Sequence, residues 1–263
     1  MTPESAQAAA QMIAEARLGQ ALLGPLPEAC FPETVEDGYQ VQRTLHDIIA
    51  KSAMGHRKGY KIGCTSGVMQ DFLSISHPCA GGVLDRGIHE GHAGLAMSDY
   101  NKPGVECEIA VQLAADIPAH HAHTADSVAP HVGAVMMAME IVDDRYTDFS
   151  AVGVATLIAD DFFGAGCVLG ELIADWQSLD LAGATGGLTI NGEHKGMGRG
   201  ADIMGHPLEA LAWLASHATQ SGQSLKAGEF VLLGSIVKCE WLDGPGEISA
   251  EITGLGRVTA SFT

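Results

Sequence analysis

The chain has 263 residues, of which 46% are hydrophobic and 17% are charged, and its formal net charge is −18. This charge argues against a nucleic-acid partner and against an anionic membrane surface, since both are bound mainly through Lys and Arg. Six dispersed cysteines form no CxxC pair, and no apolar run reaches about 18 residues. The N-terminus lacks a basic segment followed by an apolar one, so we expect a cytoplasmic protein with reduced thiols.

The N-terminal part reads as two helices followed by a short strand. Residues 3 to about 22 carry apolar side chains at helical spacing, and the Gly-Pro-Leu-Pro sequence at 24–27 ends that helix. Thr34 is suited to cap a second helix that runs to about Lys51. Glycines bracket a short strand at 59–63.

From about residue 81 the pattern is mostly that of strands. The run 134–142 is apolar throughout, so its period fits either a strand or a helix, and Asn191-Gly192 is typical of a hairpin turn. The remaining predicted elements are strands at 105–113, 164–169, 188–190, 230–233, 236–241, 248–252 and 258–262, and a helix at 207–219. We therefore predict an α+β fold in which residues 1–263 form a single functional unit, with a small helical N-terminal part at 1–58 and a β-rich catalytic body at 59–263.

Two glutamates lie inside the apolar run Val105-Glu106-Cys107-Glu108-Ile109. Alternate residues of a strand share a face, so Glu106 and Glu108 point the same way, with Cα atoms about 7 Å apart. By itself this alternation fits carboxylates that face water. Glu140, however, is a further lone acid in the second apolar run. Three carboxylates on buried segments need a compensating charge, and oxygen ligands of this kind suit Mg²⁺ or Mn²⁺.

Four other charged residues have two interpretations each. Lys61 lies in the short strand 59–63, where it could bind a carboxylate or transfer a proton, or reach solvent from an edge strand. Asp160 could line a pocket or belong to an ordinary turn. Asp143 and Arg145 could support a metal site from outside its ligand set, or form a plain ion pair.

Histidines and glycines provide weaker motifs. His120, His121, His123 and His131 cluster in a segment with loop-like composition, which makes a metal site there less favoured than the carboxylate site. Glycine motifs that bind dinucleotides lie between a strand and the helix that follows it. The glycine-rich stretch 196–200 instead follows a hairpin, so it does not indicate a dinucleotide site.

Several segments taken in order resemble one enzyme family. They are Val35–Gln42, Gly59–Ser66, Val105–Ala110, Glu140–Arg145, Ala159–Asp161, Gly205–Leu208, Ala212–Leu214 and Leu233–Ser235. Together they are similar to the 2-keto-4-pentenoate hydratase / 4-oxalocrotonate decarboxylase family of the fumarylacetoacetate hydrolase superfamily. The resemblance implies a mixed β-roll with flanking helices, which agrees with the predicted α+β pattern.

The resemblance also implies roles for individual residues. Glu106, Glu108 and Glu140 match the family's metal-binding carboxylates, Lys61 matches its active-site lysine, and Asp160 matches an aspartate at the pocket. The implied substrate-binding residues are Lys61, Ser235, Asp143 and Arg145. This sequence departs from the family pattern at Asp161, Phe162 and Phe163, where Asn and small or hydroxyl residues are usual.

The implied activity is that of a metal-dependent lyase acting on 2-oxo and 2-hydroxydienoic acids, foremost a hydratase of 2-hydroxypenta-2,4-dienoate in meta-cleavage aromatic catabolism. A 4-oxalocrotonate-type decarboxylase is the first alternative, and Arg145, Lys238 and Arg86 are candidate cations for its second substrate carboxylate. An acylpyruvate C–C hydrolase that uses His77, or a non-catalytic partner subunit, are further alternatives. Similar proteins assemble as homo-oligomers, and a complex with a neighbouring pathway enzyme is also expected.

Overall fold

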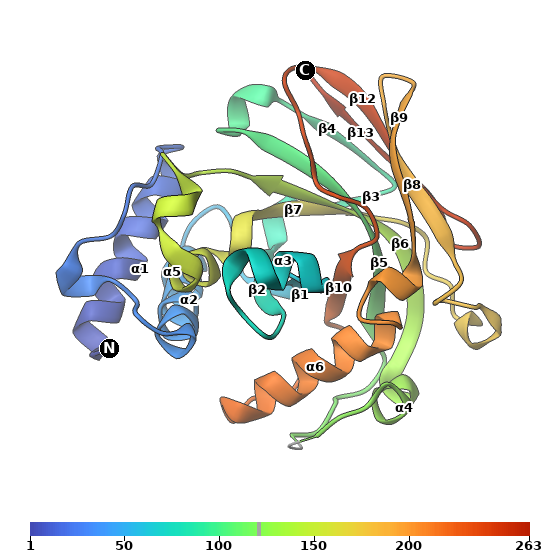
Figure 1. Cartoon of the computed structure of the whole chain (residues 1–263), viewed down its shortest axis with the longest axis horizontal. Helices are drawn as coiled ribbons and strands as arrows, with labels where there is room; N and C mark the ends of the chain where they lie inside the picture. Colours follow the sequence, from blue (N-terminus) through green and yellow to red (C-terminus); the bar gives the residue numbers. More distant parts are fainter. Residues whose placement is uncertain (120–121) are drawn as a thin grey trace.

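The computed structural model describes residues 1–119 and 122–263, and it places the helices around a body of strands (Figure 1). The helices are α1 (Pro3–Leu18), α2 (Val35–Ile49), α3 (Gly67–Leu73), α4 (Ala125–Val128), α5 (Gly153–Ala159) and α6 (Pro207–Gln220). The strands are β1 (Arg57–Gly63), β2 (Cys79–Leu84), β3 (Ile88–Glu90), β4 (His92–Leu95), β5 (Pro103–Leu113), β6 (Val132–Asp143), β7 (Gly164–Leu169), β8 (Thr185–Ile190), β9 (Glu193–Arg199), β10 (Phe230–Ser235), β11 (Glu240–Trp241), β12 (Gly246–Ile252) and β13 (Gly256–Phe262).

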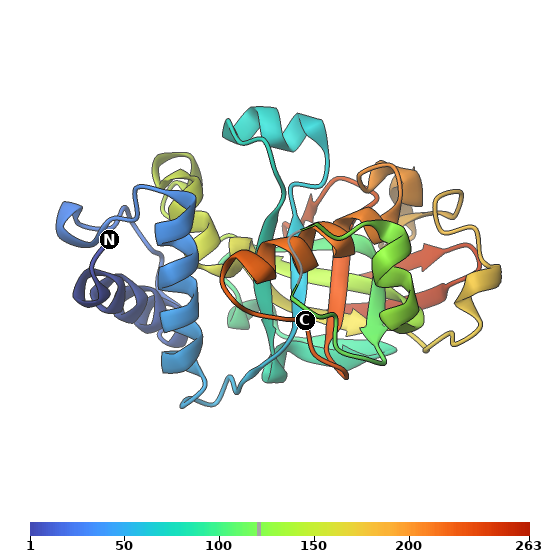
Figure 2. The ribbon, with the colours of Figure 1, turned by 90° about the horizontal axis from the view of Figure 1, so that it is seen from below.

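The strands form two sheets. The larger sheet has the order β2-β1-β10-β5-β6-β7-β3, with β11 beside β5, and the smaller one has the order β4-β13-β12-β8-β9. Strand β2 also contacts β7, so the larger sheet curls into a roll, and β12 and β13 of the smaller sheet pack against β6. Helices α1 and α2 lie together at one end of the molecule, beside this roll (Figure 2). The predicted mixed β-roll with a helical N-terminal part is confirmed.

Local sequence signals explain where the N-terminal helices begin and end. The Thr2 hydroxyl accepts a hydrogen bond from the backbone of Ser5 at the start of α1, and Thr34 forms the predicted cap of α2 as part of a reciprocal capping box. Helix α1 ends at Leu18, about four residues earlier than predicted. The reason is that Gly19 caps the helix and Gln20 adopts a left-handed φ of 51°, which no helix continues through.

The two long central strands pair with each other over their whole length. Strand β5 runs antiparallel to β6, with Glu106 opposite Glu140, so the ambiguous run 134–142 is a strand. Both faces of these strands are covered, because Ile109 on one face and Ala110 on the other are both fully buried. A strand that is covered on both faces can be apolar at nearly every position, so its sequence lacks the alternation of apolar and polar residues that would distinguish a strand from a helix.

One predicted strand is mostly wrong. Of the run 236–241, only Glu240–Trp241 pairs with a neighbour. The Ser235 hydroxyl donates a hydrogen bond to the carbonyl of Val237, which bends the chain just after β10. The hairpin prediction is confirmed, since Asn191 and Gly192 both have positive φ between β8 and β9. Within the described residues, no helix combines the length and the hydropathy that a membrane span requires.

Candidate active site

Three carboxylates converge inside the roll. The pairing of β5 with β6 sets Glu106 opposite Glu140, and Glu108 follows two residues along the same face. One oxygen of each lies within 4.8 Å of the others, and among the described residues this is the group whose arrangement could hold a metal ion. Glu108 and Glu140 are buried. The predicted cluster of Glu106, Glu108 and Glu140 therefore exists as a spatial group.

Lys61 extends into this cluster from strand β1. Its ammonium nitrogen lies 3.2 Å from Oε1 of Glu140, and its side chain is 3% exposed. The interpretation of Lys61 as a solvent-reaching edge residue is therefore wrong, since β1 lies between β2 and β10 rather than at an edge. The backbone N–H of Gly234 donates a hydrogen bond of 2.9 Å to Oε2 of Glu108, which fixes the second carboxylate.

Burial and crowding shift the pKa values of these groups. Burial and the neighbouring charge of Glu140 raise the pKa of Glu106 to about 7, and the same two causes, with Glu106, raise the pKa of Glu108. For Lys61, burial alone would lower the pKa, but the three carboxylates outweigh burial and raise it above the ordinary lysine value. In this arrangement Lys61 therefore remains an ammonium group at neutral pH.

The cluster fits a divalent cation on two grounds. Oε1 of Glu108 and Oε2 of Glu140 are buried and accept no hydrogen bond from any described group. When ionised, three carboxylates and one ammonium carry a formal charge of −3 + 1 = −2, which one divalent cation neutralises. Oxygen ligands favour a hard ion such as Mg²⁺ or Mn²⁺. Glu106, Glu108 and Glu140 are thus the residues able to hold such an ion.

Asp160 lies at the end of α5 in a buried ionic network. Arg17 forms an ion pair with its Oδ1, while Nε of Arg145 donates to Oδ2 at 3.1 Å and the Tyr146 hydroxyl donates to the same oxygen at 2.9 Å. Both carboxylate oxygens are therefore engaged by protein groups. Asp160 is buried, so it does not belong to an exposed turn, and it is its partners Arg17 and Arg145 that line a cavity; a catalytic role for Asp160 stays a prediction.

The predicted substrate-binding residues have different surroundings. Arg145 is committed to Asp160 and to the backbone carbonyls of Phe163 and Gly164. Oδ1 of Asp143 accepts hydrogen bonds from the backbones of Asn101 and Lys102, so its partner is not the Arg145 guanidinium. The Ser235 hydroxyl bonds to the backbone of Cys107, beside Glu108. Contact of these residues with substrate stays a prediction.

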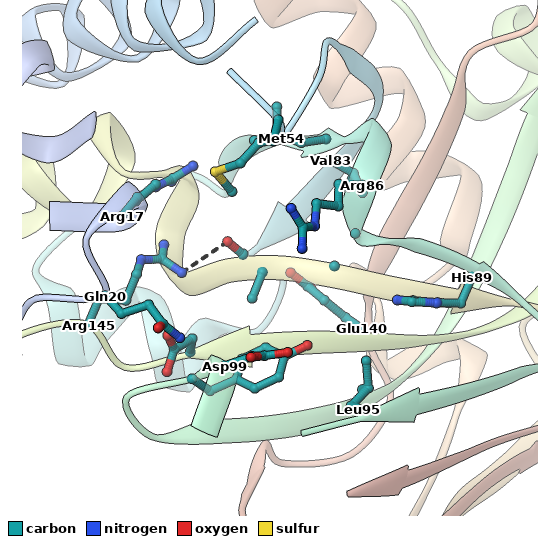
Figure 3. A pocket seen from close by; sticks show the side chains of 18 of the residues that line it. Arg17, Gln20, Met54, Val83, Arg86, His89, Leu95, Asp99, Glu140 and Arg145 are labelled. Carbon is teal, nitrogen blue, oxygen red and sulfur yellow. Dashed lines mark hydrogen bonds between the residues drawn. The ribbon is translucent and has the colours of Figure 1, made fainter. Parts of the chain in front are cut away.

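A cavity of about 570 Å³ reaches the carboxylate cluster from the side of α1. Figure 3 shows Arg17 and Arg145 on one side of it, Arg86 and His89 on the other, and Glu140 between them. Glu140 belongs to both the cluster and the cavity wall, so a molecule in the cavity would lie next to the cluster.

Among the described residues, His77, His123 and His131 belong neither to the carboxylate cluster nor to the cavity wall. His120 and His121 lie outside the described residues, whereas Nε2 of His123 is 3.1 Å from the carbonyl of Pro118. Nδ1 of His77 is 2.7 Å from the carbonyl of Pro78.

Two residues of the ionic network were given no role by the sequence. Arg17 of α1 and His46 of α2 both contact Asp161, at 3.0 Å and 2.8 Å. The departure from Asn to Asp at position 161 was the available signal, because an extra buried acid requires a cation. The sequence alone does not say which cation, since Arg17 lies 144 positions away from Asp161.

Comparison with known proteins gives consistent results. Residues 88–263 match the family model described as the fumarylacetoacetate (FAA) hydrolase C-terminal region. The chain is 32% identical over 255 residues to a 2-keto-4-pentenoate hydratase of Paraburkholderia phymatum, covering 97% of this chain and 96% of the relative. It is 33% identical over 256 residues to a 2-hydroxyhexa-2,4-dienoate hydratase of Comamonas testosteroni, covering 96% of each. The solved 4-oxalocrotonate decarboxylase from Pseudomonas putida G7, complexed with magnesium and adipate, superposes with a TM-score of 0.93 at 26% identity, over 100% of this chain and 99% of that one.

Proposed function

The chain belongs to the fumarylacetoacetate hydrolase family, and on this premise we propose that it is a divalent-metal-dependent lyase acting on 2-hydroxydienoic and 2-oxo acids. The first candidate reaction is hydration of 2-hydroxypenta-2,4-dienoate, in the catabolism of aromatic compounds by meta-cleavage. The observation that carries the proposal is the cluster of three carboxylates and one lysine, which meets a cavity of about 570 Å³ at Glu140.

We propose Glu106, Glu108 and Glu140 as the metal ligands, with Mg²⁺ as the resident ion and Mn²⁺ as a substitute. When bound, the ion supplies Lewis-acid stabilisation for negative charge that develops on the oxygen of a 2-oxo acid. The structural relative complexed with magnesium supports this choice.

The proposed role of Lys61 follows from its position. Its ammonium nitrogen lies 3.2 Å from Glu140, which lines the cavity, so a positive charge is held next to the place where an anionic substrate would bind. We propose that Lys61 orients the substrate and takes part in proton transfer to it. We further propose that Ser235, Asp143 and Arg145 bind substrate, and that Asp160 contributes to catalysis by holding Arg145 in place at the cavity wall.

Decarboxylation of a 2-oxo diacid is the second candidate, and Arg86 favours it. A decarboxylase must accept a second carboxylate, and Arg86 lines the cavity across from Arg145. Lys238, the other cation considered, is not among the cavity residues.

The wider setting is also part of the proposal. We propose that the chain works in the cytoplasm, because its free cysteines, most of them buried, fit a reducing compartment. We propose a homo-oligomer, which could associate with a neighbouring enzyme of the pathway. Residues 1–58 and 59–263 are proposed to act as one unit.

The deciding experiment measures products by mass spectrometry. Purified protein with Mg²⁺ would be mixed with 2-hydroxypenta-2,4-dienoate or with 2-oxohex-3-enedioate, each with an EDTA control. Gain of one water by the dienoate identifies a hydratase, and loss of CO₂ from the diacid identifies a decarboxylase. Absence of any metal-dependent change with either compound would contradict the proposal.

The metal ligands are tested by Glu106→Gln and Glu140→Gln. Each removes one ligand charge, so we expect affinity for Mg²⁺ and turnover to fall by at least about a hundredfold, since even partners outside the ligand set contribute 10- to 100-fold. Far-ultraviolet circular dichroism should be unchanged. Full activity of metal-stripped Glu106→Gln would refute the assignment.

A further inference from the structure

The segment that departs from the family pattern has an unusual backbone. Asp161, Phe162 and Phe163 have φ values of 53°, 50° and 67°, so three consecutive residues with side chains are left-handed. Side-chain-bearing residues adopt this region rarely, and hardly ever in succession. Such a turn persists only where the surrounding structure holds it in place.

The first residue of the turn is held by charge. Oδ2 of Asp161 lies 3.0 Å from Nη1 of Arg17, and its Oδ1 lies 2.8 Å from Nε2 of His46 and 2.7 Å from the backbone N–H of Gly82. The Asp161 side chain has no exposed area, the Arg17 side chain is 4% exposed and that of His46 is 15% exposed. Burial would raise the pKa of Asp161, but His46 and Arg17 outweigh burial and lower it, so the group stays ionised.

The third residue of the turn is held by aromatic packing. The ring of Phe163 packs edge-on against Tyr146 at 5.5 Å, Phe149 at 5.8 Å and Trp241 at 6.0 Å between ring centroids. The turn is thus anchored at both ends to different parts of the molecule, and the residue between the anchors has little freedom.

That middle residue covers the lysine of the active site. Lys61 Nζ lies 5.7 Å from the ring centroid of Phe162, which is itself only 6% exposed. Gly63 lies beside both groups, since a Cβ there would be in ordinary contact, at 3.5 Å, with the Lys61 nitrogen and with the Phe162 ring. The ring therefore shields the ammonium and limits the directions it can take.

We propose that Arg17 is a positioning residue of the active site: by holding Asp161 from helix α1, it fixes the left-handed turn that presses Phe162 against Lys61. The N-terminal helix thus acts on Lys61 through the turn, even though Arg17 itself lies at the wall of the cavity. The functional meaning of this inference rests on the proposed role of Lys61, but the contact between the turn and the lysine is measurable without any turnover.

The test compares the chemical reactivity of Lys61 among variants of the full-length chain. Reductive methylation at fixed pH in Mg²⁺ buffer, followed by peptide mass spectrometry, gives the labelling rate of each lysine. Phe162→Ala removes the cover directly, and Arg17→Met removes the charge that holds it. Each variant removes one contact that covers the ammonium or holds its cover in place, so we expect Lys61 labelling to be about tenfold faster in both, with exposed Lys58 and Lys226 unchanged.

A matched control removes an ion pair elsewhere. Arg57 of β1 pairs with Glu229 at 2.9 Å, so Arg57→Met is expected to lower the melting temperature without changing Lys61 labelling. If Arg17→Met does not fold, the double variant Arg17→Met/Asp161→Asn takes its place, because it removes one charge of each sign and leaves position 161 without an unpaired charge. Arg17→Lys then tests the contact of Arg17 with both Asp160 and Asp161. Arg17→Lys keeps the positive charge but loses the planar guanidinium that binds two carboxylates at once. We therefore expect a Lys61 labelling rate between those of the parent chain and Arg17→Met.

Two results would overturn the proposal. One is a lower melting temperature in Arg17→Met or Arg17→Lys with Lys61 labelling equal to that of the parent chain. The other is unchanged labelling in Phe162→Ala. In the hydration assay, a positioning role predicts that the variants at Arg17 lower kcat by more than they raise KM. A KM effect that exceeds the kcat effect would show instead that Arg17 acts by binding substrate from the cavity wall. An inactive parent chain would contradict the proposed function but leave the labelling comparison intact.

Discussion

At the scale of single residues, the site is organised by the conflict among three buried acids. Glu106, Glu108 and Glu140 repel one another in a region from which water is largely excluded, and Lys61 offsets part of that repulsion. A buried charge that lacks a partner destabilises a fold by several kcal/mol. The cluster is therefore a feature retained at a cost to stability, as expected for a functional site.

The raised carboxylate pKa values give a pH dependence of known sign. Folding raises the pKa of Glu106 from 4.5 to about 7, and that of Glu108 also rises. Between those pH values the folded chain binds more protons than the unfolded chain, so the free energy of unfolding of the metal-free protein should fall as pH rises from about 4.5 through about 7. Asp161 acts in the opposite direction. Its pKa is lowered on folding, so its ionised form stabilises the fold above pH 3.8, and this contribution is lost only as the pH falls below 3.8.

Divalent ions should reverse this slope. The ion binds ionised carboxylates, so its affinity increases as pH rises through about 7. Melting temperatures measured from pH 5 to pH 8 should therefore fall in EDTA and rise or stay level in excess Mg²⁺. Glu106→Gln, the control, should flatten the slope in EDTA. Parallel pH profiles with and without Mg²⁺ would contradict this account.

Arg86 decides between the two candidate reactions. It lines the cavity and is exposed there, whereas Arg145 is held by Asp160. If a second substrate carboxylate binds Arg86, Arg86→Met should raise KM for 2-oxohex-3-enedioate by about 10- to 100-fold, the value of one hydrogen bond to a charged group. The KM for 2-hydroxypenta-2,4-dienoate should change little. Equal effects on both substrates would exclude this role.

At the scale of secondary-structure elements, helix α2 shows a contribution that is local and separable. The Thr34 hydroxyl accepts a hydrogen bond from the backbone of Asp37, and the Asp37 carboxylate accepts one from the backbone of Thr34. Thr34→Ala should lower the free energy of unfolding by about 1 kcal/mol, as measured by urea denaturation. Thr34→Ser keeps the hydroxyl, so its free energy of unfolding should stay close to that of the parent chain. The affinity for Mg²⁺ should not change, because the cap lies outside the cluster.

Elements with a strong local signal could be predicted from the sequence, and elements defined by distant partners could not. The cap at Thr34, the turn at Asn191-Gly192 and the alternation around Glu106 each depend on neighbours in the chain. Glu106 and Glu140 come together once the two segments that carry them are strands that pair with each other. In contrast, the bend after Ser235 depends on a single side-chain hydrogen bond, which no periodicity reveals.

The same reasoning separates the predicted part of the site from the missed part. Glu106, Glu108, Glu140 and Lys61 are conspicuous because charged residues inside apolar strands demand an explanation. Arg17 is not, because a single arginine near the end of an alanine-rich helix also suits solvent. Its contact with Asp161 depends on the packing of α1 against α2, and of α2 against α5, which is a property of the tertiary structure.

At the scale of the whole molecule, the helical N-terminal part and the β-rich body share one ionic network. Arg17 of the first part binds Asp160 and Asp161 of the second, and Gln42 of α2 donates hydrogen bonds to the carbonyls of Ala80 and Ile158. Buried polar groups separated from their partners are strongly destabilising. The two parts should therefore unfold together.

Two measurements test this unity. In the full chain, unfolding followed by tryptophan fluorescence and by far-ultraviolet circular dichroism should give coincident single transitions. The fragment 59–263 alone lacks Arg17 and Gln42, so it should fail to give a cooperative transition and should not bind Mg²⁺ with the affinity of the full chain. Co-expression with fragment 1–58 should restore both properties in part, because the missing contacts are non-covalent. A stable fragment 59–263 that binds Mg²⁺ as tightly as the full chain would show that the body folds independently, with the N-terminal helices attached to a finished site.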